Sequence, residues 1–286
     1  MALYNNYTLE DPPVTELGDS AAVKVLCRPV WQAGYLLNGF ILGDLAGVTP
    51  VHPLGLPGFA WGQEDSDLSK AVVVSLGAGT KTARSFAWNL ARRDQVGLPT
   101  PYGLLQATSD PCSLAELGSA LKVHNVNYNG LMDTGLEWAV SKRPERLVIV
   151  DFGASKELMK SFVDAARDAS KARSLSMSIQ VIAVGTECKV FTEQEMRSQH
   201  EIGLALNRVQ MNTSGVKDRV IEELGVGAYN VALEKSYDDC VSENGLGNLS
   251  LHRFRGVRGE GGIEGAWKAL CGRSLEPNAG IVIRVD

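Results

Sequence analysis

From about residue 70 onward, short apolar runs alternate with longer segments whose apolar residues recur at helical spacing. Each run is rich in Val, Ile or Leu, as expected of a strand that is covered on both faces. This pattern predicts strands at Ala71–Ser75, Tyr102–Thr108, Lys122–Val126, Leu147–Phe152 and Ile179–Val184. Between them it predicts helices, most clearly at Thr80–Arg93 and Lys156–Ser170. Strands that alternate with helices are typical of a parallel α/β sheet.

The two ends of the chain lack this alternation. We expect a short strand at Ala21–Cys27, a dense apolar segment at Pro29–Leu42 and a loop rich in Pro and Gly at Gly43–Asp65. A last strand is expected at Gly280–Val285. The sequence thus predicts an N-terminal substrate portion (1–68), a core built on the parallel sheet (69–215) and a C-terminal segment (216–286) that returns to the first portion.

Composition excludes several classes of partner. The 286 residues carry 28 Lys and Arg against 33 Asp and Glu, so no broad basic surface exists for a nucleic-acid backbone. No basic residue precedes Lys24, and prolines break the charge-free stretch Leu45–Gln63, so we expect neither a signal peptide nor a membrane span. Five scattered cysteines without a Cys-x-x-Cys pair indicate a reducing compartment. We therefore expect a cytoplasmic protein with no nucleic-acid or membrane partner.

The first predicted strand runs into a glycine turn. The turn contains Gly77 and Gly79, and a helix is predicted to begin directly after it. Glycines two apart let the backbone approach a phosphate, and the helix presents free N–H groups to it. The turn fits G-x-G-x-x-G except that Thr82 replaces the last glycine. It predicts a phosphate or dinucleotide site, with a purely structural turn as the alternative. A triphosphate P-loop is disfavoured, because it needs glycine where Ser75 and Thr80 stand.

The second predicted strand ends in Thr108-Ser109-Asp110, where a dinucleotide site contacts the adenine ribose. Thr108 and Ser109 offer hydrogen bonds to a 2′-phosphate, but no Arg or Lys stands beside them. Asp110 suits a free ribose hydroxyl and repels a 2′-phosphate, or else it only caps the next helix. The choice between NAD and NADP stays open.

Several segments resemble the medium-chain dehydrogenases/reductases. Leu117–Tyr128 looks like the Leu-Gly-Ala-Asp-x-Val-Ile-Asn-Tyr stretch of that superfamily, and Val150-Asp151-Phe152-Gly153 and Val184-Gly185 match later strand ends. The chain is most similar to a related domain-of-unknown-function family with a Ser-Ser-Ala-Ser-Ser-Lys-Thr-Ala loop, which here reads Leu76–Ala83. It departs from that family in lacking a basic residue soon after Thr108-Ser109.

The resemblance implies a Rossmann-like dinucleotide-binding core and a reduced GroES-like N-terminal substrate portion. It implies that NADP or NAD contacts the glycine turn and the ends of the second, fourth and fifth strands, unless the cofactor has been lost. The expected cofactor-binding residues are Gly77, Gly79, Thr80, Lys81, Thr82, Thr108, Ser109, Asp151 and Gly185. Lys81 and Asp151 have alternative readings, as a solvated lysine and a structural strand end.

Few residues present themselves for chemistry. The four histidines are isolated and the cysteines are scattered, so we expect no zinc site. Tyr128, at the end of the third strand, is the candidate catalytic donor, and a packing tyrosine below the adenine side is the more ordinary alternative. Trp31, Gln32 and Tyr35 form an aromatic and polar stripe that is expected to line a substrate pocket, unless it belongs to the core.

The sequence therefore predicts an NAD(P)-dependent, zinc-independent oxidoreductase, resembling enoyl reductases, for a small apolar or polyketide-like substrate in secondary metabolism. A non-redox cyclase, isomerase or lyase on the same fold is the first alternative, and a non-catalytic dinucleotide sensor is the second. A small-molecule substrate and a homodimer are the expected partners.

Overall fold

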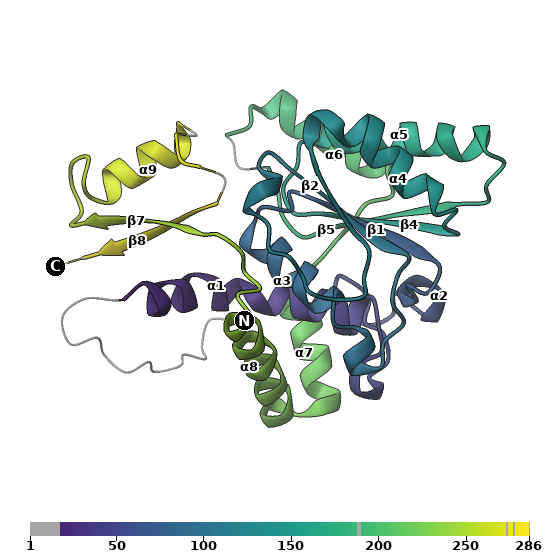
Figure 1. Ribbon diagram of the computed structural model, residues 1–286, viewed down its shortest axis with the longest axis horizontal. Helices are drawn as coiled ribbons and strands as arrows, with labels where there is room; N and C mark the ends of the chain where they lie inside the picture. Colours follow the sequence, from purple (N-terminus) through teal and green to yellow (C-terminus); the bar gives the residue numbers. More distant parts are fainter. Residues whose placement is uncertain (1–17, 188–189, 273, 277, 286) are drawn as a thin grey trace.

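Six parallel strands form the centre of the molecule (Figure 1). The computed structural model describes residues 18–187, 190–272, 274–276 and 278–285. The strands are β1 (Ala71–Leu76), β2 (Gly103–Thr108), β3 (Val123–Asn127), β4 (Arg146–Asp151), β5 (Ser178–Ala183) and β6 (Val209–Gln210). Each of the five predicted strands is present, with its ends shifted by at most one residue. The predicted parallel α/β fold is confirmed.

The order of the strands in the sheet is β3-β2-β1-β4-β5-β6. The chain moves outward from β1 to β3 and then crosses back to place β4 on the other side of β1. This is the strand order of the Rossmann fold, in which ligands bind outside the carboxyl ends of the strands where the order reverses. The loops that follow β1 and β4 therefore define the region where a site is expected.

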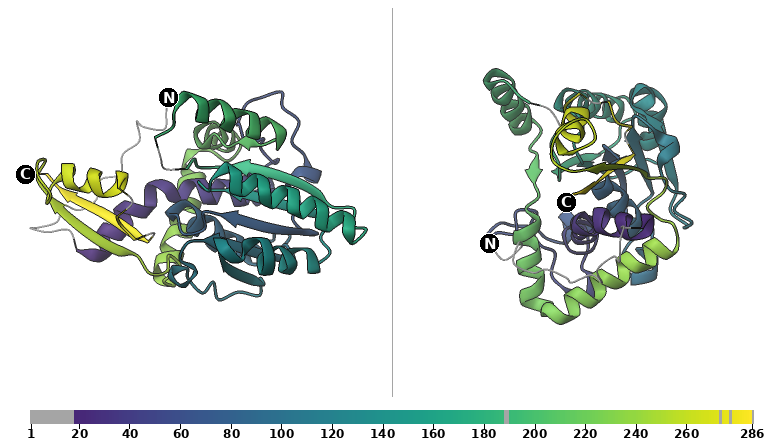
Figure 2. Two further views of the ribbon diagram at one scale, coloured as in Figure 1. Left: turned by 90° about the horizontal axis from the view of Figure 1, so that it is seen from above. Right: turned by 90° about the vertical axis from the view of Figure 1, so that its left-hand side faces the viewer.

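Helices cover both faces of the sheet (Figure 2). Against one face lies α3 (Lys81–Leu90), with α1 (Asp19–Leu36), α7 (Thr213–Leu224) and α8 (Val226–Ser242) packed around it. Against the other face lie α4 (Leu136–Ser141), α5 (Lys156–Ala172) and α6 (Glu193–Ala205). Val73 belongs to the first core, whereas Val72 and Val74 belong to the second. Because both faces are covered, β1 is buried along its whole length.

Short helical segments complete the region around the sheet. They are η1 (Leu37–Ile41, a π-helical turn), η2 (Leu45–Gly47), α2 (Gln63–Ser66), η3 (Asp94–Val96), η4 (Pro111–Ser113), η5 (Tyr128–Gly130) and η6 (Leu131–Gly135, also π-helical). Within residues 18–68 the structure contains helices and loops but no strand, so the GroES-like character expected of this portion has no counterpart there.

The strand predicted at Ala21–Cys27 is wrong, because these residues lie within α1. The buried positions Ala22, Cys27 and Trp31 recur four or five residues apart, which is helical spacing, and they continue beyond the short run that suggested a strand. Pro29 lies inside the helix and removes one backbone donor there. The helix persists because tertiary packing holds one of its faces.

Helices α1 and α3 approach each other closely. A Cβ at Gly34 would lie 2.4 Å from both the backbone nitrogen of Phe86 and the Oγ of Ser85. The Ser85 hydroxyl donates a hydrogen bond of 2.7 Å to the carbonyl oxygen of Trp31. Trp31 also stacks at a tilt on Trp88, with ring centroids 5.6 Å apart. Only glycine at position 34 permits this contact between the N-terminal helix and the sheet-covering helix.

Helix α8 returns to the N-terminal helix and contacts it through several polar groups. Arg28 Nε donates to Glu234 at 3.0 Å, and Trp31 Nε1 donates to the Ser236 hydroxyl at 3.2 Å. The Tyr237 ring meets Trp31 edge to face at 5.3 Å. The C-terminal part of the chain therefore packs against α1, on the same side of the sheet as α3.

A small β-α-β unit follows α8. It consists of β7 (Ser250–Arg255), α9 (Ile263–Cys271) and β8 (Ala279–Arg284), and its two parallel strands form a sheet separate from the main one. The expected strand Gly280–Val285 corresponds to β8. The unit lies beside the N-terminal half of α1, where a Cβ at Gly280 would meet Leu26 (Figures 1 and 2). It is joined to the rest of the molecule mainly through this helix.

Arg93 is fully buried and ties the end of the N-terminal helical segment to the loop before β2. Its guanidinium donates to the carbonyl oxygens of Asn38, Leu42 and Pro99 and to the Asn38 side chain, at 2.6 to 3.0 Å. Arg93→Met should lower the free energy of unfolding by about 2–4 kcal/mol, because it leaves buried carbonyl groups without donors. Denaturant unfolding measures this loss.

The matched control is Arg197→Met on α6, where the arginine is exposed and pairs with Glu193 in the preceding turn. This change should alter the free energy of unfolding by less than about 0.5 kcal/mol. Equal losses for the two variants would show that Arg93 has no special structural role.

The core between α1 and α8 contains the buried thiol of Cys240. Burial raises the pKa of Cys240 to about 12 from a usual value of 9.0. Its stabilising contribution is therefore complete below pH 9 and is lost as the pH rises through 12, so the free energy of unfolding should decline over that interval. Urea unfolding at several alkaline pH values should show a shallower decline in Cys240→Ala and an unchanged decline in the exposed-thiol control Cys112→Ala.

Candidate functional site at the carboxyl edge of the sheet

The glycine turn connects β1 directly to α3. Gly77 has φ +78, a conformation that favours glycine, and its N–H and that of Ala78 both donate to the carbonyl oxygen of Ala107 in β2. Thr80 caps α3, because its side chain accepts a hydrogen bond of 3.2 Å from the N–H of Ala83. The turn is therefore held between β2 and the first turn of its own helix.

Three N–H groups of this segment remain available. Among the described residues, no hydrogen bond uses the N–H groups of Gly79, Lys81 and Thr82. They lie at the N-terminus of α3, where the helix dipole adds positive potential. An anion placed at the switch point between β1 and β4 would find these donors unoccupied.

The turn is also covered by neighbouring side chains. Gly77, Ala78 and Gly79 are all buried, and a Cβ at Gly79 would lie 2.8 Å from Thr108 Oγ1. Thr108, at the end of β2, is itself only 3% exposed. Gly79 thus has a packing role that does not depend on a ligand, whereas Thr80, the next residue, is exposed.

Tyr128 lies close to the glycine turn. Burial raises the pKa of its phenol, a backbone hydrogen bond with Gly77 opposes that rise, and the nearby Asp151 carboxylate adds to it. The phenol therefore stays protonated at neutral pH. The structure thus brings together three residues predicted from separate motifs, the turn after β1, the end of β3 and the end of β4.

Lys81 connects the turn to the small C-terminal unit. Its ammonium donates a hydrogen bond of 3.1 Å to the carbonyl oxygen of Ala279 at the start of β8. Burial lowers the pKa of Lys81, the Cys27 thiol opposes this, and the positive charge of Arg84 contributes to it. Thr82, in the next position, is partly buried. The ammonium of Lys81 keeps further donors for a phosphate beside this carbonyl partner.

Arg84 supports the turn from within the protein. Its guanidinium donates to the carbonyl oxygens of Gly79 (3.1 Å), Ser113 (2.7 Å) and Leu246 (2.6 Å), and to the Ser113 hydroxyl at 3.0 Å. Burial lowers its pKa, and the charge of Asp110 opposes that effect. This arginine orients the Gly79 peptide and was not singled out from the sequence, because a helical arginine carries no motif.

The loops after β1, β4 and β5 touch through their backbones. A Cβ at Gly77 would lie 3.2 Å from the carbonyl carbon of Phe152, and a Cβ at Gly185 would lie 2.7 Å from the Phe152 oxygen. Asp151 is buried, and its carboxylate accepts bonds of 2.9 Å from the N–H groups of Gly153 and Ala154. The fold thus brings together Gly77, Asp151 and Gly185. Close backbone packing explains the two glycines, and hydrogen bonds to the β4 loop explain the aspartate.

The end of β2 presents its polar groups at the same edge. Ser109 is exposed, and its carbonyl oxygen accepts a bond of 2.8 Å from Asn127. Asp110 is half-buried, and its N–H lies 3.5 Å from Thr108 Oγ1. The charge of Asp110 acts on the buried Arg84, which is already bound to carbonyl groups.

The aromatic stripe lies elsewhere. Trp31 and Tyr35 are buried in the core, where Tyr35 meets Phe40 and Tyr229 edge to face, and Gln32 is half-buried on α1. Trp31 and Tyr35 therefore lie in the core, which was the alternative to a role in a substrate pocket.

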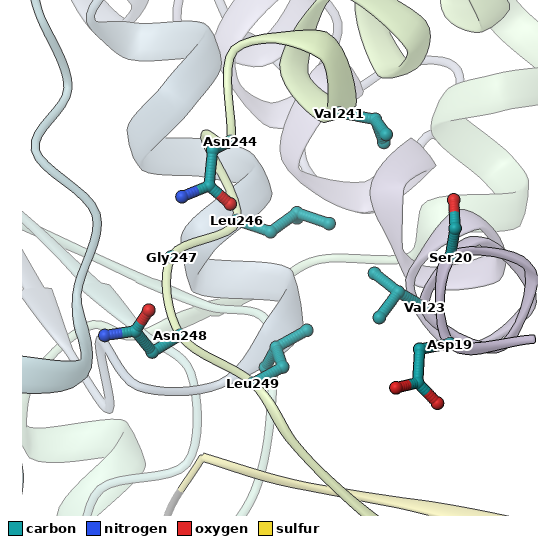
Figure 3. A pocket seen from close by; sticks show the side chains of 9 residues that line it. All are labelled: Asp19, Ser20, Val23, Val241, Asn244, Leu246, Gly247, Asn248 and Leu249. Carbon is teal, nitrogen blue, oxygen red and sulfur yellow. The ribbon is translucent and has the colours of Figure 1, made fainter.

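A cavity of about 340 Å³ lies instead between the start of α1 and the linker after α8 (Figure 3). Val23, Leu246 and Leu249 project into it, and Asp19 and Ser20 border it from α1. The linker passes from this cavity to Arg84, which binds the Leu246 carbonyl oxygen. Leu246 therefore connects this cavity to Arg84, the arginine that also binds the carbonyl oxygen of Gly79 in the glycine turn.

The described residues offer neither a cluster of metal ligands nor a membrane-spanning helix. No group of three or more His, Cys, Asp or Glu side chains converges in a way that suits a metal ion. No helix in the described part of the chain combines the length and apolar character needed to cross a membrane. Cys188 lies outside the described residues.

With this geometry in place, the sequence can be compared with known proteins. Residues 1–276 match the family described as "Protein of unknown function (DUF2855)". The chain belongs to this family. A domain-of-unknown-function family was the resemblance expected from the loop and strand-end motifs. A comparison with curated proteins finds no match.

Solved structures provide more distant likenesses. A candidate NADPH:quinone reductase from Mesorhizobium loti has 14% identity and a TM-score of 0.39, over 76% of this chain and 53% of that one. A short chain alcohol dehydrogenase from E. coli, complexed with NADH, has 11% identity and a TM-score of 0.37, over 94% and 60%. The chain thus spans between half and two thirds of the length of these proteins, and at these scores neither likeness bears on its function.

The contact between Gly79 and Thr108 can be tested by a double-mutant cycle. Gly79→Ala should lower the free energy of unfolding by about 1–3 kcal/mol, because its Cβ meets Thr108 Oγ1. In a Thr108→Ala background, the same change should cost less than about 1 kcal/mol, because the hydroxyl is gone. Additive losses in denaturant unfolding would contradict the contact.

Proposed function

We propose that this protein binds a nicotinamide dinucleotide at the carboxyl edge of its sheet and acts as a zinc-independent oxidoreductase. The observation that carries the proposal is the set of free N–H groups at the start of α3, which lies at the switch point of a Rossmann strand order. The proposed substrate is a small apolar or polyketide-like molecule of secondary metabolism, and the proposed compartment is the cytoplasm.

The residues at this edge fit the dinucleotide part by part. The unoccupied N–H groups and Lys81 would hold the diphosphate, with the turn's small residues allowing its approach. The adenosine ribose would lie at the end of β2, and the nicotinamide half near the loops after β4 and β5. The residues assigned to it are Gly77, Gly79, Thr80, Lys81, Thr82, Thr108, Ser109, Asp151 and Gly185.

The carboxylate at the end of β2 favours NAD over NADP in this proposal. Asp110 accepts hydrogen bonds from ribose hydroxyls and repels a 2′-phosphate, and the nearby Ser109 is exposed for a further contact. Arg84, the cation coupled to Asp110, is already bound to carbonyl groups and lies buried. Asp110→Asn should therefore narrow the difference in affinity between NADH and NADPH.

Tyr128 is the proposed hydrogen-bond donor to the substrate. When bound, the dinucleotide would supply or accept the hydride. Burial raises the pKa of the Tyr128 phenol, so the phenol stays protonated at neutral pH and would donate a hydrogen bond to an oxygen that gains negative charge. Burial also raises the pKa of Asp151, and the hydrogen bonds that its carboxylate accepts from the N–H groups of Gly153 and Ala154 oppose this rise.

One observation favours the alternative of a non-redox cyclase, isomerase or lyase. Gly77–Gly79 are buried, and Lys81 is already paired with the carbonyl oxygen of Ala279. A fold that no longer uses its dinucleotide needs no open approach to the turn. Under this alternative, Tyr128 keeps its role as a protonated acid, and the dinucleotide does not bind.

Dinucleotide binding separates these functions. NADH should bind saturably with a Kd below about 1 mM, equivalent to about 4 kcal/mol, as measured by quenching of tryptophan fluorescence. Lys81→Ala should weaken binding by about tenfold, because one charge-assisted contact to the diphosphate is lost. Thermal melts of each variant show whether it remains folded.

The matched control is Lys70→Ala. Lys70 is exposed at the opposite, amino end of β1 and pairs with Glu145, so this variant should bind NADH within about twofold of the wild type. Failure of NADH and NADPH to bind the wild-type protein would exclude the oxidoreductase and the sensor together. Saturable binding that is indifferent to Lys81 would place the site away from the glycine turn.

A further inference from the structure

A second cavity, of about 230 Å³, lies on the face of the sheet opposite α3. Its walls come from the ends of β4 and β5, the first turn of α5, and the inner side of α6. Charged, polar and apolar side chains converge on it. The lining residues used below are Asp151, Lys156, Glu187, Phe191, Met196 and Arg208.

Arg208 is brought into this cavity by the end of α6. Asn207 adopts a left-handed conformation (φ +49), and the Arg208 N–H donates to the carbonyl oxygen of Gly203, so the helix stops and the chain turns into β6. The Arg208 side chain is 10% exposed. A buried guanidinium thus lies at the carboxyl ends of β4 and β5.

The hydrogen bonds of this guanidinium are incomplete. Its Nη2 lies 3.4 Å from an Asp151 oxygen and 3.3 Å from the Gly185 carbonyl oxygen, both long for a charge-assisted bond. Its Nε is buried and has no partner among the described residues. Buried Arg84 and Arg93, by contrast, each donate short bonds to several carbonyl groups. Arg208 is therefore the buried arginine whose donors are left for another acceptor.

Lys156 adds a second cation at the same cavity. Its ammonium donates to the carbonyl oxygen of Gln199 at 2.8 Å and keeps further donors for a ligand. Burial and then the charge of Arg208 lower its pKa, which places the two cations near each other. Asp151 offsets part of this charge, but one of its oxygens is already taken up by the backbone of the β4 loop.

We propose that this cavity binds a small organic carboxylate with an apolar body. The planar guanidinium of Arg208 supplies parallel donors that match the two oxygens of a carboxylate, and Lys156 supplies a further donor. Phe191 and Met196 provide apolar surface for the rest of the molecule. The volume of about 230 Å³ limits the ligand to the size of a single ring or a short chain.

The walls favour a single negative charge over a phosphate dianion. The lining carries the cations Arg208 and Lys156, the carboxylates of Asp151 and Glu187, and the imidazole of His200. A monoanion would be matched by the donors of Arg208, whereas a dianion would bring a second negative charge close to two carboxylates. The neutral amide of the same shape lacks the charge and presents a donor where the guanidinium needs an acceptor.

Calorimetric titration of the full-length protein without any dinucleotide tests this site independently of the proposed oxidoreductase. The probes are benzoate, its neutral analogue benzamide, and inorganic phosphate. Benzoate should bind saturably, and benzamide and phosphate should each bind at least tenfold more weakly. Arg208→Gln should weaken benzoate binding at least tenfold, and Arg197→Gln, at an exposed arginine on α6, should leave it unchanged.

Lys156→Met provides a second test that leaves Arg208 and Asp151 in contact, and it should weaken benzoate binding at least threefold. If Arg208→Gln does not fold, the Lys156→Met variant tests whether benzoate binds in this cavity. Absence of saturable benzoate binding by the wild type, equal binding of benzoate and benzamide, or preference for phosphate would each overturn the proposal. Retention of full affinity by folded Arg208→Gln or by Lys156→Met would also overturn it.

Discussion

The close approach of α1 to α3 is the contact on which the parts outside the sheet depend. Gly34 lets the two helices touch, and the Ser85 hydroxyl binds the Trp31 carbonyl oxygen across the contact. Helix α8 then packs on the other side of Trp31, and the β7-α9-β8 unit rests on the N-terminal half of α1. A side chain at position 34 would separate α1 from the sheet and would displace these elements together.

Three buried arginines show how the same residue type serves different purposes in one fold. Arg93 and Arg84 are surrounded by carbonyl oxygens and join segments that are distant in the sequence. Their positive charges are offset by dipoles, which suits fixed structural links. Arg208 has only long contacts and an unpartnered Nε, and it faces a cavity. An arginine whose N–H groups all make short hydrogen bonds to the protein serves as a structural link. An arginine with unpartnered N–H groups remains available to a ligand.

Hydrophobic periodicity was sufficient for the sheet, because strands that are buried on both faces must be continuous apolar runs. It failed at Ala21–Cys27, where a short run could not reveal that α8 and α3 would bury one side of a helix. The glycine and strand-end motifs identified residues that do meet at one edge. Arg84 and Arg208 could not be found in this way, because their importance lies in which carbonyl or carboxylate groups the folded chain brings to them. Trp31 illustrates the same limit, since aromatic residues mark cores and pockets alike.

The hydrogen bond from Lys81 to the Ala279 carbonyl oxygen has a consequence for the tolerance of this region to change. The acceptor belongs to the main chain, so every residue type at position 279 offers the same oxygen. Substitutions along β8 can accumulate without breaking the link. A shift in the pairing of β8 with β7 would break it, because a different carbonyl group would then face the lysine. The contact therefore constrains the register of β8 more strongly than its side-chain composition.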